Sequence, residues 1–246
     1  MTRKSGPLRV VIIGNGVAGV SVAMSVRQRD PDAQLVIVSG ETDYFFSRTA
    51  LMYAYMDKMT RQDLEPYERA VWKRMGIELV RAWVTDLDAE GRTVRLDSGK
   101  TLQYDRLVFA VGAAPNMFPW SGSETVKEGL VHFVSMQDLE ACERLTPTTK
   151  KAVVVGGGLI GIELVECLNH HGVDVTFLIR EPWYWPMALG PEESEFVADH
   201  MRAHGVDVRL GEEMVEMSAD SGGRVQSVQT DKGETLSCQM LGIAAG

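Results

Sequence analysis

Two glycine-rich motifs, each between an apolar run and a helix-like stretch, constrain this chain more than any other feature. They read VVIIGNGVAGV and AVVVGGGLIGIE, and their spaced glycines are Gly14, Gly16, Gly19, Gly156, Gly158 and Gly161. In such a motif the first glycine permits a tight strand-to-helix turn, the second admits a pyrophosphate, and the third allows helix and strand to pack closely. The pyrophosphate then meets free N–H groups at the positive end of the helix dipole. Two motifs predict two dinucleotides, between which electrons pass.

The segments that flank the motifs have the expected character. Apolar runs at Leu8–Ile13 and Ala152–Val155 predict buried strands before the glycines. Val17–Arg29 and Leu159–Asn169 predict the helices that follow. At each motif the alternative is a tight glycine turn that serves packing alone.

Composition excludes several classes of partner. The chain has 246 residues, 45% hydrophobic content and a net charge of −9, which argues against nucleic acid and anionic membranes. No apolar run approaches the about 18 residues of a membrane span, and the apolar N-terminal run belongs to the first strand, so we predict a cytoplasmic protein. The three cysteines form no CxxC pair and are expected to be buried, and the five histidines show no metal-site spacing.

The two halves of the chain repeat one design. Each half has a strand, a glycine motif, a helix and a second strand, then a helix that ends at a glycine, short strands separated by turn residues, and a closing apolar strand. The second strands are Gln34–Ser39 and Val175–Ile179, and the helix-ending glycines are Gly76 and Gly205. This order predicts an α/β chain with two Rossmann-like domains, each with a parallel sheet and an inserted β-meander.

The combination of GNGVAG, FFSRTAL, LVFAVGAAPN and GGGLIGIE resembles the pyridine nucleotide–disulfide oxidoreductases. Within them it is most similar to the flavoprotein components of ferredoxin, rubredoxin and nitrite reductases. The resemblance extends from Leu8 to Gly246 and implies FAD in the first domain, residues 1–118, and NADH or NADPH in the second, residues 119–246. The repeat equates Gly246 with Gly112, so we expect a fragment that lacks the return segment completing the FAD domain, and therefore weaker FAD binding than in a full-length relative.

The resemblance assigns FAD-binding roles by position. Glu41 would bind the adenosine ribose, Arg48 would lie along the flavin and its diphosphate, and the Val84 backbone would meet the adenine. Ala110, Val111 and Gly112 match a turn near the flavin, with valine in place of the usual threonine. The remaining FAD residues are those of the first motif, Gly14, Gly16, Val17, Ala18 and Gly19. Alternatives are a solvated charge for Glu41, a surface ion pair for Arg48 and plain strand packing for Val84.

The second motif would bind the nicotinamide coenzyme through Gly156, Gly158, Leu159, Ile160 and Gly161. Glu163 matches a glutamate near the nicotinamide, against the alternative of an exposed first-turn carboxylate favoured by the helix dipole. Ile179 stands at the usual ribose-binding acid position. The next residue, Arg180, suits a 2′-phosphate and the following one, Glu181, suits a 2′-hydroxyl, so NADPH and NADH both stay open, with NADH favoured.

One departure from the family pattern narrows the chemistry. The disulfide-reducing branches carry cysteine near the flavin, whereas the matching residues here are Phe45–Thr49, without sulfur. We therefore expect an FAD-dependent oxidoreductase that passes a hydride from NAD(P)H to FAD, and then electrons to an acceptor, without a redox cysteine and without an acid–base side chain for the hydride step.

The acceptor stays open among a small redox protein, a quinone and oxygen, and the resemblance allows a homodimer of the full-length protein. Alternative functions are a two-nucleotide binding module or sensor with little turnover and a flavin-free NAD(P) dehydrogenase. The aromatic segment Pro182–Pro186 is expected to pack on its own domain, with stacking on the coenzyme as the alternative.

Overall fold

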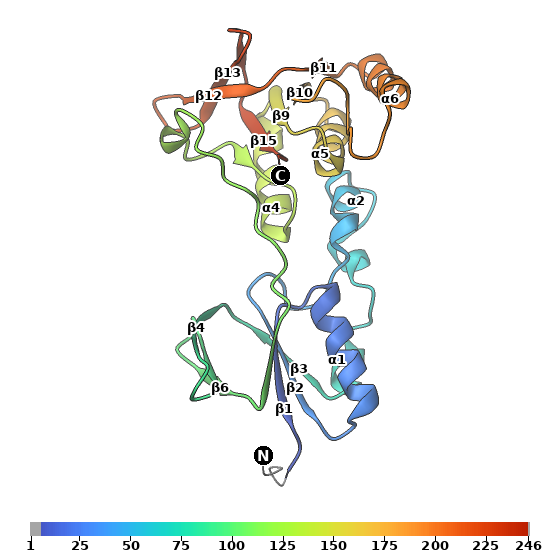
Figure 1. Ribbon diagram of the computed structural model, residues 1–246, viewed down its shortest axis with the longest axis vertical. Coiled ribbons are helices and arrows are strands. Elements are labelled where there is room, and N and C mark those ends of the chain that lie inside the picture. Colours follow the sequence, from blue (N-terminus) through green and yellow to red (C-terminus); the bar gives the residue numbers. More distant parts are fainter. Residues whose placement is uncertain (1–5, 246) are drawn as a thin grey trace. The chain divides into compact units, whose positions relative to one another are not determined.

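The computed structural model describes residues 6–245, which form two compact α/β units (Figure 1). The first unit comprises the described residues up to Ala50 together with Met59–Ala113, and the second comprises Leu51–Lys58 and the described residues from Ala114 onward. The domain limits 1–118 and 119–246 stay a prediction. The sequence did not predict that Leu51–Lys58, from the first half of the chain, packs in the second unit.

The first unit is built on a four-stranded parallel sheet in the order β3-β2-β1-β7, with a separate antiparallel meander β4-β5-β6. Its helices and strands are β1 (Arg9–Ile13), α1 (Val17–Arg29), β2 (Gln34–Ser39), α3 (Ala70–Arg74), β3 (Ile77–Arg81), β4 (Val84–Asp88), β5 (Thr93–Leu96), β6 (Thr101–Gln103) and β7 (Arg106–Phe109). Two 3-10 helices, Arg48–Ala50 and Arg61–Leu64, lie between β2 and α3.

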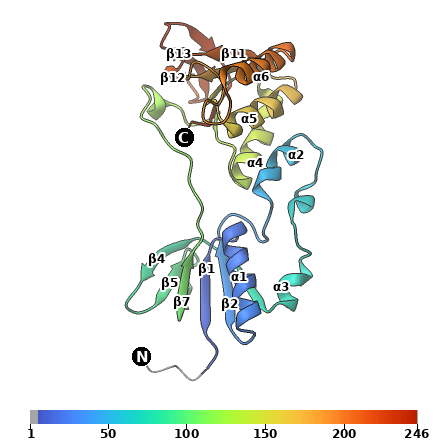
Figure 2. The same cartoon turned by 45° about the vertical axis from the view of Figure 1, so that its right-hand side comes forward.

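Both faces of this sheet are covered, which explains the continuous apolar runs of its central strands, β1 and β2. Val10 and Ile12 of β1 pack with Val20 of α1 on one face. Val11, between them, points to the other face and packs with Val94 of the meander. Figures 1 and 2 show α1 and the β4–β6 meander on opposite sides of the sheet. Because side chains alternate along a strand, two covered faces require a continuous apolar run instead of an alternating one.

The second unit repeats this plan with five parallel strands in the order β11-β10-β9-β15-β8 and a meander β12-β13-β14. Its elements are α2 (Leu51–Tyr55), β8 (Leu130–Val131), α4 (Met136–Leu145), β9 (Lys151–Val155), α5 (Leu159–His170), β10 (Asp174–Ile179), α6 (Pro191–Ala203), β11 (Asp207–Leu210), β12 (Met214–Ala219), β13 (Val225–Thr230), β14 (Thr235–Ser237) and β15 (Met240–Ile243). Two 3-10 helices are Ser123–Thr125 and Thr146–Thr148.

The predicted fold class is confirmed in both units, each of which has a parallel sheet and an antiparallel meander. The first helix and second strand have the predicted bounds, while α5 extends one residue further and β10 begins one residue earlier. Gly76 and Gly205 adopt the left-handed conformation expected after α3 and α6. Gly246, the predicted counterpart of Gly112, lies outside the described residues.

Three contacts hold the short helix α2 in the second unit. The Tyr55 carbonyl lies 2.6 Å from Nε2 of His171, and the Tyr55 hydroxyl lies 2.5 Å from Oγ1 of Thr146. The Cys167 thiol is 3.7 Å from the Met52 carbonyl. Burial raises the pKa of Tyr55 above its usual value and that of Cys167 to about 12. The Tyr55 hydroxyl and the Cys167 thiol therefore stay protonated near pH 7 and contribute neutral hydrogen bonds to the packing of α2.

All three cysteines are buried and free, as predicted. Burial also raises the pKa of Cys142 above its usual value and that of Cys238 to about 12. A buried thiol with a raised pKa is a poor nucleophile and redox group, because the thiolate is the reactive form. The structure therefore gives these residues a packing role.

The third glycine of the second motif allows α5 to lie close to the sheet. A Cβ at Gly161 would lie 2.1 Å from the Gly156 carbonyl oxygen and 3.1 Å from the Phe177 ring. Both neighbours are held, one by the motif backbone and the other by the core, since Phe177 is fully buried.

We expect Gly161→Ala to lower the free energy of unfolding of the second unit by about 1–3 kcal/mol, because the added methyl group overpacks the interface between helix and sheet. Urea unfolding followed by circular dichroism measures the change. Glu166→Ala, at an exposed position of the same helix, is the control and should shift stability by less than about 0.5 kcal/mol. Equal effects of the two variants would contradict this account of Gly161.

Candidate functional site

In the turn formed by the first glycine motif, two of the three glycines pack closely against other backbone and the middle one faces open space. Gly14 has φ of +108°, and a Cβ there would lie 2.1 Å from the carbonyl oxygen of Ala110, just beyond β7. A Cβ at Gly19 would lie 2.0 Å from the Gly14 carbonyl oxygen. At Gly16, by contrast, no described atom other than those of Gly16 and its two chain neighbours lies within 4 Å of where a Cβ would be. The open position is the one where a pyrophosphate approaches the backbone.

The second motif has the same geometry. Gly156 has φ of +116°, and a Cβ there would lie 2.6 Å from the carbonyl oxygen of Ala244, just beyond β15. At Gly158 no described atom other than those of Gly158 and its two chain neighbours lies within 4 Å of a Cβ position. Ala244 thus corresponds to Ala110, and each glycine of the second motif has the same kind of surroundings as its counterpart in the first.

Both motif helices begin with exposed apolar residues. Gly16 and Gly158 are the N-cap residues of α1 and α5, and neither has a side chain that could accept from the first N–H groups. Val17 is 71% exposed and Leu159 is 53% exposed. Ala18 and Ile160, the next residues, are exposed as well. An uncapped helix start with a vacant side fits an anionic pyrophosphate, which takes the place of a capping side chain.

The predicted ribose ligand, Glu41, follows β2 and forms a two-pronged ion pair with Arg48. The Nη1–Oε1 distance is 2.8 Å and the Nη2–Oε2 distance is 2.7 Å. Glu41 is the more buried partner, with 18% of its side chain exposed against 46% for Arg48. The guanidinium also lies 5.0 Å from the Phe46 ring centroid. The structure thus brings the two predicted FAD residues together and fixes the carboxylate at the sheet edge.

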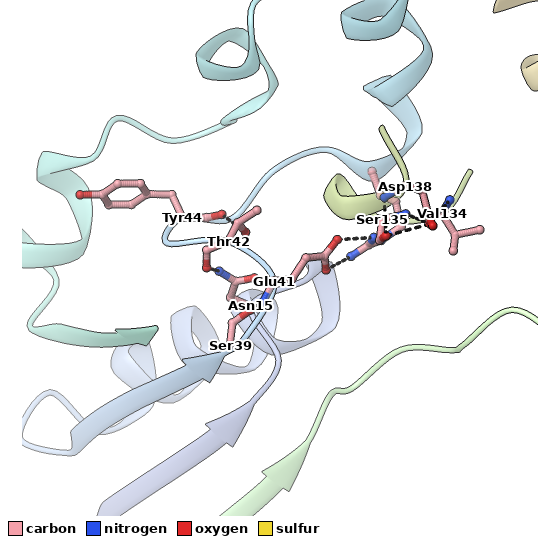
Figure 3. Close-up of polar contacts among 9 residues, drawn as sticks. Asn15, Ser39, Glu41, Thr42, Tyr44, Val134, Ser135 and Asp138 are labelled. Carbon is pink, nitrogen blue, oxygen red and sulfur yellow. Dashed lines mark hydrogen bonds and ion pairs between the residues drawn. The ribbon is translucent and has the colours of Figure 1, made fainter. Parts of the chain in front are cut away.

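A small hydrogen-bond network fixes the backbone around Glu41, as Figure 3 shows. The Asn15 side chain, inside the first motif, donates to the Thr42 carbonyl at 3.1 Å. The Glu41 N–H donates to the Ser39 hydroxyl at 3.2 Å, and the Thr42 hydroxyl donates to the Tyr44 carbonyl. Asn15 is buried. Its hydrogen bond links the first motif to the loop after β2, and the glycine spacing in the sequence did not predict this contact.

The other predicted FAD residues lie at the carboxyl edge of the same sheet. The Ala110 N–H donates to the Ile13 carbonyl, which carries β7 alongside β1 up to the motif. Val111 is 65% exposed, and Gly112 has φ of +71°. Val84 begins β4 and is half-buried. The exposed valine in this turn lacks threonine's hydroxyl.

Glu163 lies in α5, one turn after the open glycine, and is partly buried. Burial, followed by repulsion from Glu166, raises the pKa of its carboxyl. Burial and then the Glu163 charge raise the pKa of Tyr184 to about 12. Tyr184 is 2% exposed, and its ring packs 6.3 Å from the Phe177 ring, so the Pro182–Pro186 segment packs on its own unit through this residue.

At the end of β10, where coenzyme specificity was predicted to be set, the buried Ile179 is followed by two charged residues, Arg180 and Glu181. A Cβ at Gly157 would lie 2.6 Å from the Ile179 side chain, so Ile179 belongs to the core and not to a ribose site. Arg180 and Glu181 form an ion pair of 3.1 Å. The Arg180 side chain is 73% exposed and that of Glu181 is 32% exposed.

Two glycine-motif turns on two parallel sheets define the class of two-domain dinucleotide-binding α/β proteins. The family model described as pyridine nucleotide-disulphide oxidoreductase matches residues 8–246, and the chain belongs to this family. The cofactors expected from the sequence, FAD and NADH or NADPH, are those of the family, and the open glycine positions fit two dinucleotides.

Relatives with known roles include electron-transfer reductases. The 5,5'-dehydrodivanillate O-demethylase ferredoxin reductase subunit of Sphingobium sp. is 30% identical over 240 residues, covering 96% of this chain and 57% of the relative. The terpredoxin reductase of Pseudomonas sp. is 27% identical, with coverage of 96% and 57%. The ferredoxin reductase for the CYP199A2 system from Rhodopseudomonas palustris matches with a TM-score of 0.86 at 27% identity, covering 97% of this chain and 58% of that one. In the covalent putidaredoxin reductase–putidaredoxin complex, a chain 26% identical matches with a TM-score of 0.86, covering 98% and 59%.

The chain therefore spans somewhat more than half the length of these relatives. No helix among the described residues is long and apolar enough to cross a membrane. Residues 6–245 also contain no group of three or more His, Cys, Asp or Glu side chains arranged to hold a metal ion.

The raised pKa of Glu163 predicts a pH dependence of stability. A carboxyl whose pKa is higher in the folded than in the unfolded chain favours folding when protonated, so this contribution is lost as pH rises from the unfolded value near 4.5 through the folded pKa. We expect Glu163→Gln, which cannot ionise, to gain unfolding temperature relative to wild type as pH rises from 4 to 7. The exposed carboxylate variant Glu216→Gln is the control. A constant difference between Glu163→Gln and wild type across this range would refute the raised pKa.

Proposed function

We propose that this protein is an FAD-dependent NAD(P)H oxidoreductase whose first unit binds FAD and whose second unit binds the nicotinamide coenzyme. The observation that carries the proposal is the duplicated geometry of the motifs, in which Gly14 and Gly156 are packed while Gly16 and Gly158 are open. A turn needed only for packing would have no reason to leave the middle glycine vacant in both copies. When bound, FAD would supply the capacity to accept a hydride and to release electrons to an acceptor.

The chain's own residues bind and orient. Glu41, held by Arg48, presents a fixed carboxylate that would accept hydrogen bonds from ribose hydroxyls. The positive charge of the Arg48 guanidinium would favour the negative charge of the diphosphate. In the second unit, Glu163 would contribute a carboxyl near the nicotinamide, and burial raises the pKa of that carboxyl.

We propose that electrons leave without a cysteine relay and go to a small redox protein. The segment Phe45–Thr49 has no sulfur, and the three cysteines are buried with raised pKa values. Relatives are ferredoxin and terpredoxin reductases, which supports an acceptor of this kind.

The proposal is tested by mixing the FAD-loaded chain with NADH or NADPH and following loss of flavin absorbance by stopped flow. We expect bleaching in wild type. Gly16→Val should weaken FAD binding at least tenfold, because its side chain would enter the open position where the pyrophosphate would lie. Gly158→Val should leave FAD bound but slow bleaching at subsaturating coenzyme at least tenfold.

Gly222→Val is the matched control, since Gly222 lies in an exposed turn between meander strands and outside both motifs. Its FAD binding and bleaching should equal those of wild type. Bound flavin that neither coenzyme bleaches would favour a two-nucleotide binding module. Coenzyme binding without any flavin binding would favour a flavin-free dehydrogenase.

For the coenzyme we propose NADH, because the less exposed Glu181 carboxylate is fixed beside the end of β10 by Arg180. A carboxylate accepts from a 2′-hydroxyl and repels a 2′-phosphate. We expect Glu181→Gln to lower the preference for NADH over NADPH about fivefold or more, measured as the ratio of dissociation constants, and Arg180→Gln to raise it. If both variants shift the ratio in the same direction, the assignment of opposed roles fails.

A further inference from the structure

Trp83 lies at the carboxyl edge of the first unit's sheet, beside the end of β2. The parallel pairing of β2 and β3 ends at Ser39 and Arg81, and the Ala82 N–H then donates to the Ser39 carbonyl at 3.0 Å. Trp83 follows directly, and its carbonyl accepts from the Asp97 N–H at 2.9 Å. The Trp83 backbone is therefore tied to β2 through its neighbour and to the meander through its own carbonyl.

The indole of Trp83 rests on the backbone of Gly40. A Cβ at Gly40 would lie 2.1 Å from Cδ2 and 2.2 Å from Cε2 of the ring, so the fused edge of the indole occupies the space of a side chain. Gly40 does not adopt a positive φ, and its backbone alone does not demand glycine. The missing side chain at this position is explained by the ring that lies there.

This packing fixes the indole but leaves most of it open. Trp83 is 59% exposed, although one part of the ring is pressed on Gly40. Glu41, the residue after Gly40, has its carboxylate fixed by Arg48, and Val84 follows Trp83. The indole, which follows β3 in the chain, contacts Gly40, and the fixed carboxylate belongs to the next residue, Glu41, so the two side chains come from adjacent places beyond the end of β2.

In doubly wound sheets the adenosine half of a dinucleotide lies over the carboxyl end of the second strand, with its ribose on the acidic residue there. A base beyond that ribose would meet the surface to which Trp83 belongs. The indole of Trp83 has a large aromatic face, and its contact with Gly40 holds the ring in place. Such a face is suited to stacking on a purine, because every nucleic-acid base has a π surface.

We propose that the indole of Trp83 stacks on the adenine of FAD. Gly40 positions the indole, because the absence of a side chain there lets the ring pack on its backbone. This inference rests on the proposal that the first unit binds FAD. It adds a binding residue that neither the glycine motif nor the family resemblance identifies, since the resemblance assigns the adenine contact to the backbone of Val84 alone.

The test is a titration of the 246-residue chain with FAD, followed by tryptophan emission and flavin absorbance, with ADP as competitor. We expect Trp83→Ala to weaken FAD binding roughly 5- to 150-fold, the range for loss of one base–aromatic stack. The inhibition constant of ADP should rise by a similar factor, because ADP shares the adenosine half. Trp83→Phe, which keeps an aromatic face, should stay within about threefold of wild type.

Gly40→Ala keeps the indole but tests its position, because the added methyl group would displace the ring. This variant should also weaken FAD binding. Leu87→Ala, an exposed apolar position of β4, is the control and should bind FAD as wild type does. Unchanged thermal unfolding and NADH binding would show that the Trp83 and Gly40 variants remain folded.

The outcomes separate the two proposals. Wild type that binds no FAD overturns the assignment of the first unit and this inference with it. Wild type that binds FAD while Trp83→Ala binds it equally well overturns the stacking role alone, as does failure of ADP to compete. Equal weakening by Trp83→Ala and Leu87→Ala would show a nonspecific effect of the meander and would also overturn it.

Discussion

The close approach of one glycine backbone to the residue that follows the last strand of each unit, β7 or β15, determines much of this structure. Gly14 lies against the Ala110 carbonyl and Gly156 lies against that of Ala244. Where a Cβ would overlap backbone atoms, only glycine permits the closing strand, the motif turn and the helix start to meet at one point. This meeting brings the segments after β2 and β7, and in the second unit those after β10 and β15, to one edge of a parallel sheet.

At that edge of each sheet, an arginine orients a neighbouring carboxylate through an ion pair. Arg48 fixes Glu41 in the first unit, and Arg180 fixes Glu181 in the second. Exposed ion pairs contribute little to stability, so their value here lies in orientation. A carboxylate held in one geometry presents its oxygens in a fixed direction, which suits recognition of vicinal hydroxyls.

Sequence patterns predicted the elements well where the physical signal is local. Continuous apolar runs identified β1 and β2, and the helix that begins after Gly16 ends at Arg29 as expected. Both meanders followed from turn residues at regular spacing. Placement of Leu51–Lys58 in the second unit could not be predicted, because it depends on contacts of Tyr55 with His171 and Thr146, which are distant in sequence.

The sequence by itself determined the class of the protein, its two dinucleotide motifs and the absence of sulfur at Phe45–Thr49, since each is a matter of residue type and spacing. Only the tertiary structure decided that Glu41 pairs with Arg48, that Gly157 makes room for a buried Ile179 and that Trp83 lies on Gly40. These facts depend on side chains brought together across strands and loops. A glycine in the sequence shows that space is available, but only the fold shows which neighbour uses that space and which position is left for a ligand.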